Sequence, residues 1–225
     1  MNLKNEKTLS DDPALLLASM SPRRQELMGL TGWTFHISPA DVDETPLPEE
    51  SPQAYVSRLA EAKARAAAHE ADQDSLVIAA DTTVAHHGYI LGKPENDEQA
   101  RDMLRSLRGG THQVFTAVVV FQPATKRMET DLAATDVPMR DYSDAEIEAY
   151  IATGDPFDKA GSYAIQHTEF NPVEGLTGCY ANVVGLPLCH LARTLSRFGM
   201  TAKTDLPSAC QKALSYQCKV YENII

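Results

Sequence analysis

Short apolar runs, separated by small and turn-forming residues, recur along the chain. Runs of this length with such boundaries are typical of buried strands. They predict strands at residues 14–19, 33–38, 74–80, 113–121, 132–139 and 179–184. A hairpin turning at His87-Gly88 is predicted over residues 82–92. The segment TGDPFDKAGSYAIQ, residues 153–166, is predicted to be a turn-rich loop that runs into a further strand.

Helices are predicted between these strands from capping residues and helical spacing of apolar positions. They begin at Ser21-Pro22 and span residues 51–70, 96–107, 143–153, 187–198 and, in the tail, 207–221. Ser143 and Glu146 form a capping-box sequence. Because strands and helices are mixed without strict alternation, we expect an α/β fold with a mixed twisted sheet in two lobes around a cleft.

The negative net charge of the chain argues against some classes of binding partner. The chain has 225 residues and a formal net charge of −11. Nucleic acids and membrane surfaces are polyanions, so neither is an expected partner. The four cysteines all follow residue 178 and form no CxxC pair, which favours reduced thiols. With no apolar leader or membrane-length apolar run, we expect a cytoplasmic protein.

Three regions are expected along the chain. Residues 1–12 are polar and predicted to be a disordered lead-in. Residues 13–200 carry the predicted strands and most helices and are expected to form a single two-lobed catalytic domain. Residues 201–225 are expected to be a C-terminal extension, to which no role is assigned.

The stretch LASMSPRR contains polar and basic residues at the point where a strand is predicted to end and a helix to begin. Free backbone N–H groups at a helix N-terminus attract anions. Arg23 and Arg24 lie in the first turn, where a cation opposes the helix dipole unless an anion is bound. Ser19 adds a hydroxyl, so phosphate binding is one interpretation. A simple N-cap by Ser21, with solvated arginines, explains the same residues.

Carboxylates provide a second candidate group. In IAADTTV, Asp81 is placed where an apolar strand is expected to end, which is where open α/β sheets hold ligands. Asp81 could hold a divalent cation or orient a water, and Thr82 could hydrogen-bond a ligand. Glu44, in the acidic loop DVDETP, could join Asp81. A turn cap and a solvated acidic loop are the ordinary alternatives.

Lysines and one glutamine complete the candidates. Lys63, Lys93 and Lys159 could each contact phosphates, although a lone lysine is usually solvated. Gln166 has an amide that can donate and accept at a base edge, although a polar residue at a strand edge is commoner. No HExxH, GxSxG, Walker A or GxGxxG motif occurs, which argues against the enzyme classes that these motifs mark.

Eight strings follow one another along the chain: LASMSPRRQELM, VDETP, YVSRLAEAKA, IAADTTV, LGKP, ARDMLRSLRGGTHQVFTAV, GDPFDKAGSYAIQ and ANVVGLPL. In this order they resemble the Maf family of nucleoside triphosphate pyrophosphatases, over about residues 15–195. The resemblance implies an inosine triphosphatase-like fold around a nucleotide cleft. It also implies cleavage between the α and β phosphates, a Mg²⁺ or Mn²⁺ cofactor and a homodimer.

The resemblance also implies roles for particular residues. Asp81, Lys63 and Lys93 correspond to catalytic positions, and Glu44 with Asp81 to metal-binding positions. The substrate-binding positions correspond to Ser19, Arg23, Arg24, Thr82 and Gln166. The glutamine places the chain in the branch that prefers dTTP and UTP, whose bases present N3–H beside O4, where one amide can pair with both.

One further expectation concerns the mechanism. A carboxylate among several cations is expected to keep a low pKa, so Asp81 alone would be a weak base.

Two alternative functions remain open: a nucleotide-binding regulator of cell division with incidental hydrolysis, and a phosphomonoesterase built on the Asp-Thr pair. The second usually needs another aspartate, which the DTT sequence lacks.

Overall fold

A six-stranded mixed sheet forms the centre of the protein in the computed structural model, which describes residues 12–225. Residues 1–11 of the lead-in, which the sequence predicts to be disordered over residues 1–12, lie outside the described residues. The strands are β1 (Leu15–Leu17), β2 (Phe35–Ile37), β3 (Leu76–His86), β4 (Tyr89–Leu91), β5 (Thr111–Gln122) and β6 (Arg127–Pro138). Their order is β2-β1-β3-β5-β6, with β4 paired to β3. The predicted mixed sheet is therefore confirmed.

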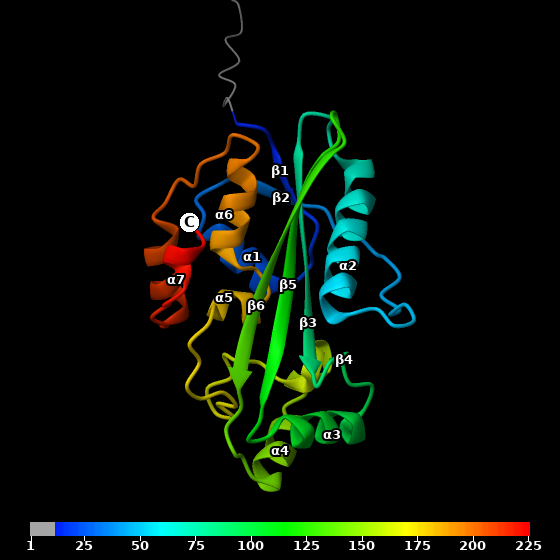
Figure 1. Cartoon of the computed structure of the whole chain (residues 1–225), viewed down its shortest axis with the longest axis vertical. Helices are drawn as coiled ribbons and strands as arrows, with labels where there is room; N and C mark the ends of the chain where they lie inside the picture. Colours follow the sequence, from blue (N-terminus) through cyan, green and yellow to red (C-terminus); the bar gives the residue numbers. More distant parts are fainter. Residues whose placement is uncertain (1–11) are drawn as a thin grey trace, which may run out of the picture.

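The long strands β3, β5 and β6 run through the whole molecule (Figure 1). β1 is parallel to both β2 and β3, whereas β5 is antiparallel to its two neighbours, β3 and β6. The prediction that β3 ends at Asp81 is wrong, because the strand stays paired with β5 as far as the Ala85–Gln113 register. Asp81 therefore lies in the middle of a strand, where it is paired with Ala117 of β5.

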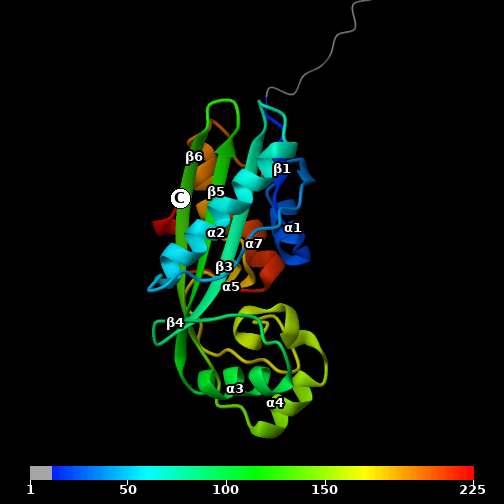
Figure 2. The same ribbon diagram turned by 90° about the vertical axis from the view of Figure 1, so that its right-hand side faces the viewer.

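Helices cover both faces of the sheet. They are α1 (Pro22–Gly29), α2 (Pro52–Ala67), α3 (Asp97–Leu107), α4 (Asp144–Ile151), α5 (Tyr180–Val184), α6 (Leu188–Ser196) and α7 (Leu206–Leu214). Helix α2 lies on one face of the long strands and α6 on the other, while α3 and α4 lie together at the far end of the sheet (Figures 1 and 2). In β3, Val77 and Ala79 pack toward α2, whereas Ile78 and Ala80 pack toward α6. Burial on both faces explains why this strand is a continuous apolar run.

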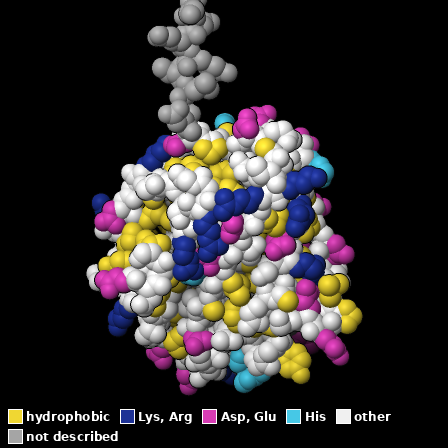
Figure 3. Space-filling view, turned by 45° about the horizontal axis from the view of Figure 1, so that its top comes forward, with side chains coloured by type: hydrophobic (Ala, Val, Ile, Leu, Met, Phe, Trp, Pro, Cys, Tyr) yellow, Lys and Arg dark blue, Asp and Glu magenta, His cyan; other side chains and the backbone are white. Residues whose placement is uncertain are grey.

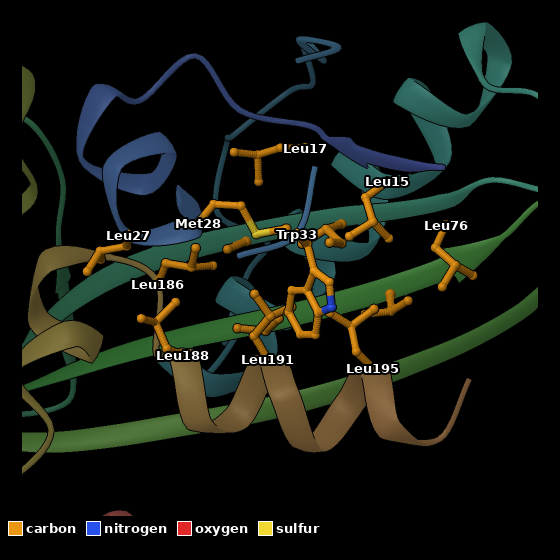
Figure 4. Packing of buried hydrophobic residues seen from close by; sticks show 14 of the residues in the cluster. Leu15, Leu17, Leu27, Met28, Trp33, Leu76, Leu186, Leu188, Leu191 and Leu195 are labelled. Carbon is orange, nitrogen blue, oxygen red and sulfur yellow. The ribbon is translucent and has the colours of Figure 1, made fainter. Parts of the chain in front are cut away.

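The core beneath α6 is the largest apolar cluster. Figure 4 shows Trp33 among leucines from β1, α1 and α6. Each fully buried leucine contributes roughly 1.5–3 kcal/mol to folding. A separate cluster fills the far lobe, where Leu104 and Leu107 of α3 meet Ile147 and Tyr150 of α4. The two lobes expected from the sequence therefore have distinct cores, connected by the long strands.

Residues 179–184 are not the strand that the sequence predicts. They form the start and body of α5, a single short helix that ends when Gly185 N–H donates to the Ala181 carbonyl at 3.0 Å. The buried Asn182 side chain donates to the Val114 carbonyl of β5 at 2.9 Å. This tertiary hydrogen bond outweighs the strand preference of the neighbouring β-branched residues.

The strand predicted near Gln166 is also absent from the described structure. The segment forms two 3₁₀ turns, η2 (Asp155–Asp158) and η3 (Ala160–Ser162), followed by a further turn that contains Gln166. Gly161 has φ +72°, and a Cβ there would lie 2.9 Å from Val84 Cγ1. This close approach requires glycine and bends the chain against β3. Two further 3₁₀ segments, η1 (Ala68–Glu70) and η4 (Tyr221–Asn223), complete the described elements.

Basic and acidic side chains lie next to one another on the face shown in Figure 3. Two ion pairs link β6 to α6 and to the residue that follows it. Arg193 lies 2.8 Å from Asp131, and Arg197 lies 2.9 Å from Glu129. These arginines are therefore neutralised locally. In residues 12–225, no helix combines the length and apolar character needed to cross a membrane.

Candidate active site

A cavity of about 700 Å³ opens between the two lobes. Its walls come from the start of α1, the 43–46 loop, α2, the middle of β3, the loop after β4, the η2–η3 segment and α5. The structure brings nearly all the sequence-predicted site residues to this cavity: Arg23, Arg24, Glu44, Lys63, Asp81, Thr82, Lys93 and Gln166. Ser19 lies behind the wall, 3.4 Å from an Arg24 nitrogen.

Lys63 joins the two carboxylates at the bottom of the cavity. Its Nζ donates to Asp81 Oδ1 at 2.6 Å and to Glu44 Oε1 at 2.6 Å. The Lys63 and Asp81 side chains are only 12% and 9% exposed, whereas that of Glu44 is 48% exposed. Helix α2 therefore carries a cation to the centre of β3. The ordinary view of Lys63 as a solvated lysine is wrong.

Burial separates the acidities of the two carboxyl groups. Burial raises the pKa of Asp81, and the nearby charges of Lys63 and Arg24 only partly oppose this effect. Burial also acts to raise the pKa of Glu44, but the hydrogen bond and charge of Lys63 bring that pKa below its ordinary value. The expected low pKa of Asp81 is thus wrong, because desolvation outweighs the cations. Asp81 is the better proton acceptor of the pair.

Arg24 is held by neighbouring elements rather than by solvent. Its Nε donates to the Gly185 carbonyl at 2.8 Å, and its Nη2 donates to Thr82 Oγ1 at 3.0 Å. Thr82 in turn lies 3.0 Å from Thr116 Oγ1 on β5. Desolvation lowers the pKa of the guanidinium, with Asp81 opposing that effect. Arg24 therefore ties α1, β3 and α5 together beside Asp81.

The first turn of α1 lies at the mouth of the cavity. Ser21 occupies the predicted N-cap position, but its side chain makes no capping hydrogen bond. Its N–H donates instead to Ser19 Oγ at 3.2 Å. Arg23 reaches across the cavity to Asp158 at 3.5 Å, a long contact that an anion could replace. The helix entry is thus available to a ligand, as the sequence indicates.

Lys93 and Gln166 are exposed side chains that both line the cavity. Lys93 follows β4 and lowers the pKa of Glu44 through its charge. Gln166 lies in the turn after η3. Both side chains can reach a ligand in the cavity without losing a hydrogen bond within the protein.

The sequence reasoning missed two supporting residues, Tyr55 and Asn182, and considered Lys159 only as a phosphate contact. Tyr55 donates to the Glu44 carbonyl at 2.8 Å and so holds the acidic loop, while burial raises its pKa to about 12. Lys159 is 8% exposed and donates to Asp155 at 2.9 Å and to Asp158. Asn182 links α5 to β5. The DKAG and ANVVG strings contain the last two, but only their tertiary contacts distinguish them from ordinary polar residues.

The donor set fits a hard divalent cation that is shared with a ligand. Within residues 12–225, no three His, Cys, Asp or Glu side chains are grouped so that they could hold a metal alone. However, Asp81 and Glu44 converge on one Lys63 nitrogen, so their oxygens lie close together. Mg²⁺ commonly uses one or two carboxylates and completes its shell with water and phosphate oxygens. The site therefore fits a metal that arrives with an anionic ligand.

The chain matches one family model and is similar over most of its length to several proteins that share one name. The family model described as "Maf-like protein" matches residues 14–198. A protein of Pelotomaculum thermopropionicum named "dTTP/UTP pyrophosphatase" is 46% identical, covering 82% of this chain and 96% of the relative. Proteins with the same name from Anaeromyxobacter dehalogenans and Thermomicrobium roseum are 47% and 46% identical, covering 87% and 88% of this chain and 99% and 92% of theirs.

The solved structures give a more distant similarity. The structure titled as the Staphylococcus aureus Ham1 protein is 15% identical, with a TM-score of 0.42. The match covers 71% of this chain and 90% of that one.

Proposed function

Because the chain belongs to the Maf family, we propose that it hydrolyses dTTP and UTP to the monophosphate and pyrophosphate. The observation that carries this proposal is the Lys63 bridge between Asp81 and Glu44 at the bottom of a cavity of about 700 Å³. A pair of carboxylates with a buried cation suits attack of water on a phosphate. The relatives named dTTP/UTP pyrophosphatases support the substrate.

Asp81 is proposed as the group that accepts the proton of the attacking water. Burial raises its pKa, which strengthens it as a base relative to an exposed aspartate. Strand pairing with β5 and the Lys63 hydrogen bond hold its carboxylate in place. The oxygen of water attacks Pα, the Pα–O bond to the β phosphate breaks, and pyrophosphate leaves.

Lys63, Lys93 and Arg23 are proposed to neutralise the triphosphate and the leaving group. Arg23 would exchange its 3.5 Å contact with Asp158 for a phosphate oxygen. Arg24 and Ser19 are proposed to act at the same end of the substrate, with Arg24 oriented by Gly185 and Thr82. The proximity of several cations to one cavity explains how an acidic protein binds a polyanion.

Asp81 and Glu44 would hold the divalent cation, which we propose to be Mg²⁺ or Mn²⁺. When bound, the cation supplies positive charge that favours loss of a proton from water and offsets charge on the phosphate oxygens. Lys63 shares both carboxylates, so metal binding requires its ammonium group to yield at least one of these contacts.

Gln166 is proposed to read the base. Its exposed amide lies on the cavity wall, where one donor and one acceptor can pair with O4 and N3–H of uracil or thymine. Cytosine lacks the N3–H and carries an amine in place of O4, so the same amide would be left partly unpaired. Thr82 is proposed to contact the substrate beside Arg24.

Three further statements remain predictions that rest on the sequence and on the family. They are the homodimer, the cytoplasmic location, and the division into a catalytic domain of residues 13–200 and an extension of residues 201–225.

The test is pyrophosphate release from a panel of nucleoside triphosphates with Mg²⁺ or Mn²⁺. We expect selective release from dTTP and UTP. Asp81→Asn should retain nucleotide binding and lose at least about 100-fold in kcat, because general base catalysis contributes 10²–10⁴-fold. A near-normal rate in this variant would remove Asp81 as the base.

The same assay separates the alternatives. Orthophosphate in place of pyrophosphate would favour a phosphomonoesterase. Tight nucleotide binding without release of either product would favour a nucleotide-binding regulator, which would act through its bound state. Release of pyrophosphate mainly from other bases would retain the reaction and overturn the role of Gln166.

A further inference from the structure

Gln166, the proposed base reader, lies in a tight turn. The His167 N–H donates to the Ala164 carbonyl at 3.1 Å, so residues 164–167 form a β-turn with Gln166 as its third residue. Ala164, Ile165 and Gln166 all line the cavity. The Gln166 side chain is exposed, so its place in the cavity depends on the backbone of this turn.

The Tyr150 side chain of α4 contacts both ends of this turn from behind the cavity wall. Its hydroxyl accepts a hydrogen bond from the Ala164 N–H at 3.0 Å. Its ring lies 4.8 Å from the His167 ring in an edge-to-face arrangement. Tyr150 is only 2% exposed, so a packed core holds it against the turn.

Phe170 fixes the position of the Tyr150 ring. The two rings stack with their centroids 4.3 Å apart and 9° between their planes. The Phe170 N–H also donates to His167 Nδ1 at 3.0 Å. The residues that follow the turn are therefore packed against the same tyrosine as the residue that begins it.

Asp155 orients the Tyr150 hydroxyl. The hydroxyl donates to Asp155 Oδ2 at 2.6 Å. A phenol has one proton, and its donation to Asp155 leaves the oxygen lone pairs available to the Ala164 N–H. Burial raises the pKa of Tyr150, so this proton is retained at neutral pH.

Lys159 directs its donors into the same network. Its Nζ donates to the Asp155 carbonyl at 2.6 Å, to Asp155 Oδ1 at 2.9 Å, and to Asp158. An ammonium group has three protons, so each of them already has an acceptor. Burial acts to raise the pKa of Asp155, but the hydrogen bonds from Lys159 and Tyr150 bring it below its ordinary value. Asp155 is thus a fixed carboxylate.

We propose that Tyr150 is a positioning residue for base selectivity, which holds the turn that presents Gln166 while Asp155 orients its hydroxyl. Tyr150 acts through Gln166 and does not touch the substrate. This role rests on the proposed function, since it requires Gln166 to pair with the base. Without the hydroxyl, the buried Ala164 N–H loses its partner and the turn can shift, so the amide no longer meets O4 and N3–H together.

The experiment compares the wild-type protein with Tyr150→Phe in pyrophosphate release from UTP and CTP. Phenylalanine keeps the ring and removes only the hydroxyl. We expect the UTP-to-CTP ratio of kcat/KM to fall about fivefold, which corresponds to about one hydrogen bond at the base. The fall should appear as a higher KM for UTP with kcat little changed, because pairing with the base stabilises the bound substrate and the transition state equally.

Tyr142→Phe is the matched control. Tyr142 is 1% exposed and its ring lies 4.8 Å from that of Phe170, but its hydroxyl donates to the Leu104 carbonyl of α3 at 2.8 Å. Both variants lose one buried tyrosine hydroxyl, so Tm should fall in both. The UTP-to-CTP ratio should fall only in Tyr150→Phe. A ratio that falls equally in both variants, or in neither, would overturn the proposal.

A double substitution tests whether Tyr150 acts through Gln166. In a Gln166→Ala background, Tyr150→Phe should leave the UTP-to-CTP ratio unchanged, because the contact that it positions is already lost. The same fall in this background as in the wild-type protein would contradict the proposal.

Asp155→Asn supplies the result if Tyr150→Phe fails to fold. It keeps the tyrosine and the shape of its partner, but it removes the charge that strengthens their hydrogen bond. The UTP-to-CTP ratio should fall in the same direction, and a wild-type ratio would count against the proposal.

Binding of UMP and CMP, measured by calorimetry, separates this role of Tyr150 from the proposed function. If the wild-type protein releases no pyrophosphate, the proposed function fails, and Tyr150→Phe is still expected to narrow a preference for UMP over CMP. A wild-type protein that shows neither pyrophosphate release nor such a preference would overturn both.

Discussion

Lys63 and Asp81 show how much a single side chain depends on its surroundings. In the sequence, Lys63 does not differ from the other lysines. The sequence pattern also predicts, wrongly, that the strand ends at Asp81. Their 2.6 Å contact on neighbouring elements turns both into site residues. Burial then raises the pKa of Asp81, although cations surround it. The nearby positive charges alone would lower the pKa of Asp81. Desolvation acts in the opposite direction and is the larger effect.

At Gln166, replacement by glutamate tests base recognition. The Gln166→Glu variant loses the amide donor to O4 and presents a second acceptor instead. We expect kcat/KM for UTP and dTTP to fall about 10-fold or more, with a smaller change for CTP, because one hydrogen bond is worth about 1 kcal/mol and an unpaired group costs more. Steady-state kinetics on the three substrates measure this. Equal losses on all bases would contradict the assignment.

At His112, protonation is expected to weaken the fold. The imidazole is 2% exposed and lies 2.8 Å from the Tyr163 hydroxyl. Burial lowers its pKa to about 4, below the ordinary 6.5. The unfolded state therefore binds the proton first, so stability present above pH 6.5 is lost as the pH falls from 6.5 toward 4.

The expected loss attributable to His112 is about 1 kcal/mol between pH 7.5 and pH 5.5. Urea unfolding of the wild-type protein and of His112→Gln at both pH values measures it. The variant should show a correspondingly flatter pH dependence. Identical pH dependences in the two proteins would show that His112 does not titrate as described.

Helix α5 is the element in which the sequence pattern misleads most. Its β-branched residues favour a strand, but Asn182 bonds to β5 and Gly185 ends the helix beside Arg24.

The capped helices, by contrast, are predicted correctly from the sequence. Ser143 and Glu146 form the predicted capping box of α4, and Ser51 caps α2. Local capping is readable from sequence because both partners lie within one turn.

At Gly185, an alanine is expected to disturb both the backbone and the site. The residue has φ +122°, and a Cβ would lie 3.2 Å from Thr82 Oγ1 and 3.4 Å from Arg24 Nε. Strain of this kind costs roughly 1–3 kcal/mol, so Tm should fall by about 5 °C and activity should fall with it. Thermal unfolding and pyrophosphate release measure the two effects.

Gly29→Ala is the matched control, since no atom lies within 4 Å of its added Cβ. A Gly185→Ala protein as stable and active as this control would mean that the turn does not support the site.

The C-terminal extension is part of the packed molecule. Helix α7 contributes Leu206, which is 2% exposed, and Trp33 Nε1 donates to the Thr201 carbonyl at 3.1 Å. Tyr216 and Arg193 add hydrogen bonds near its other end. The apolar face of α7 thus covers part of the core beneath α6, a contact that a sequence comparison ending at residue 198 does not reveal.

Leu206→Ala tests this packing. Truncation of a buried leucine costs about 2–5 kcal/mol, which predicts a Tm decrease of roughly 5–15 °C. Differential scanning calorimetry measures the change. Leu47→Ala, at a position that is 54% exposed, serves as the control and should leave Tm nearly unchanged. Equal effects of the two substitutions would show that the extension does not contribute to the core.

The sequence alone determined the features that depend on neighbouring residues or on ordered motifs. These include the capped helices, the long paired strands β5 and β6, and most of the charged residues that line the cavity. Only the tertiary structure decided which elements approach one another. It extended β3 past Asp81 and turned residues 180–184 into a helix. The physical reason is that pairing, desolvation and close packing depend on distant partners, which local sequence patterns do not contain.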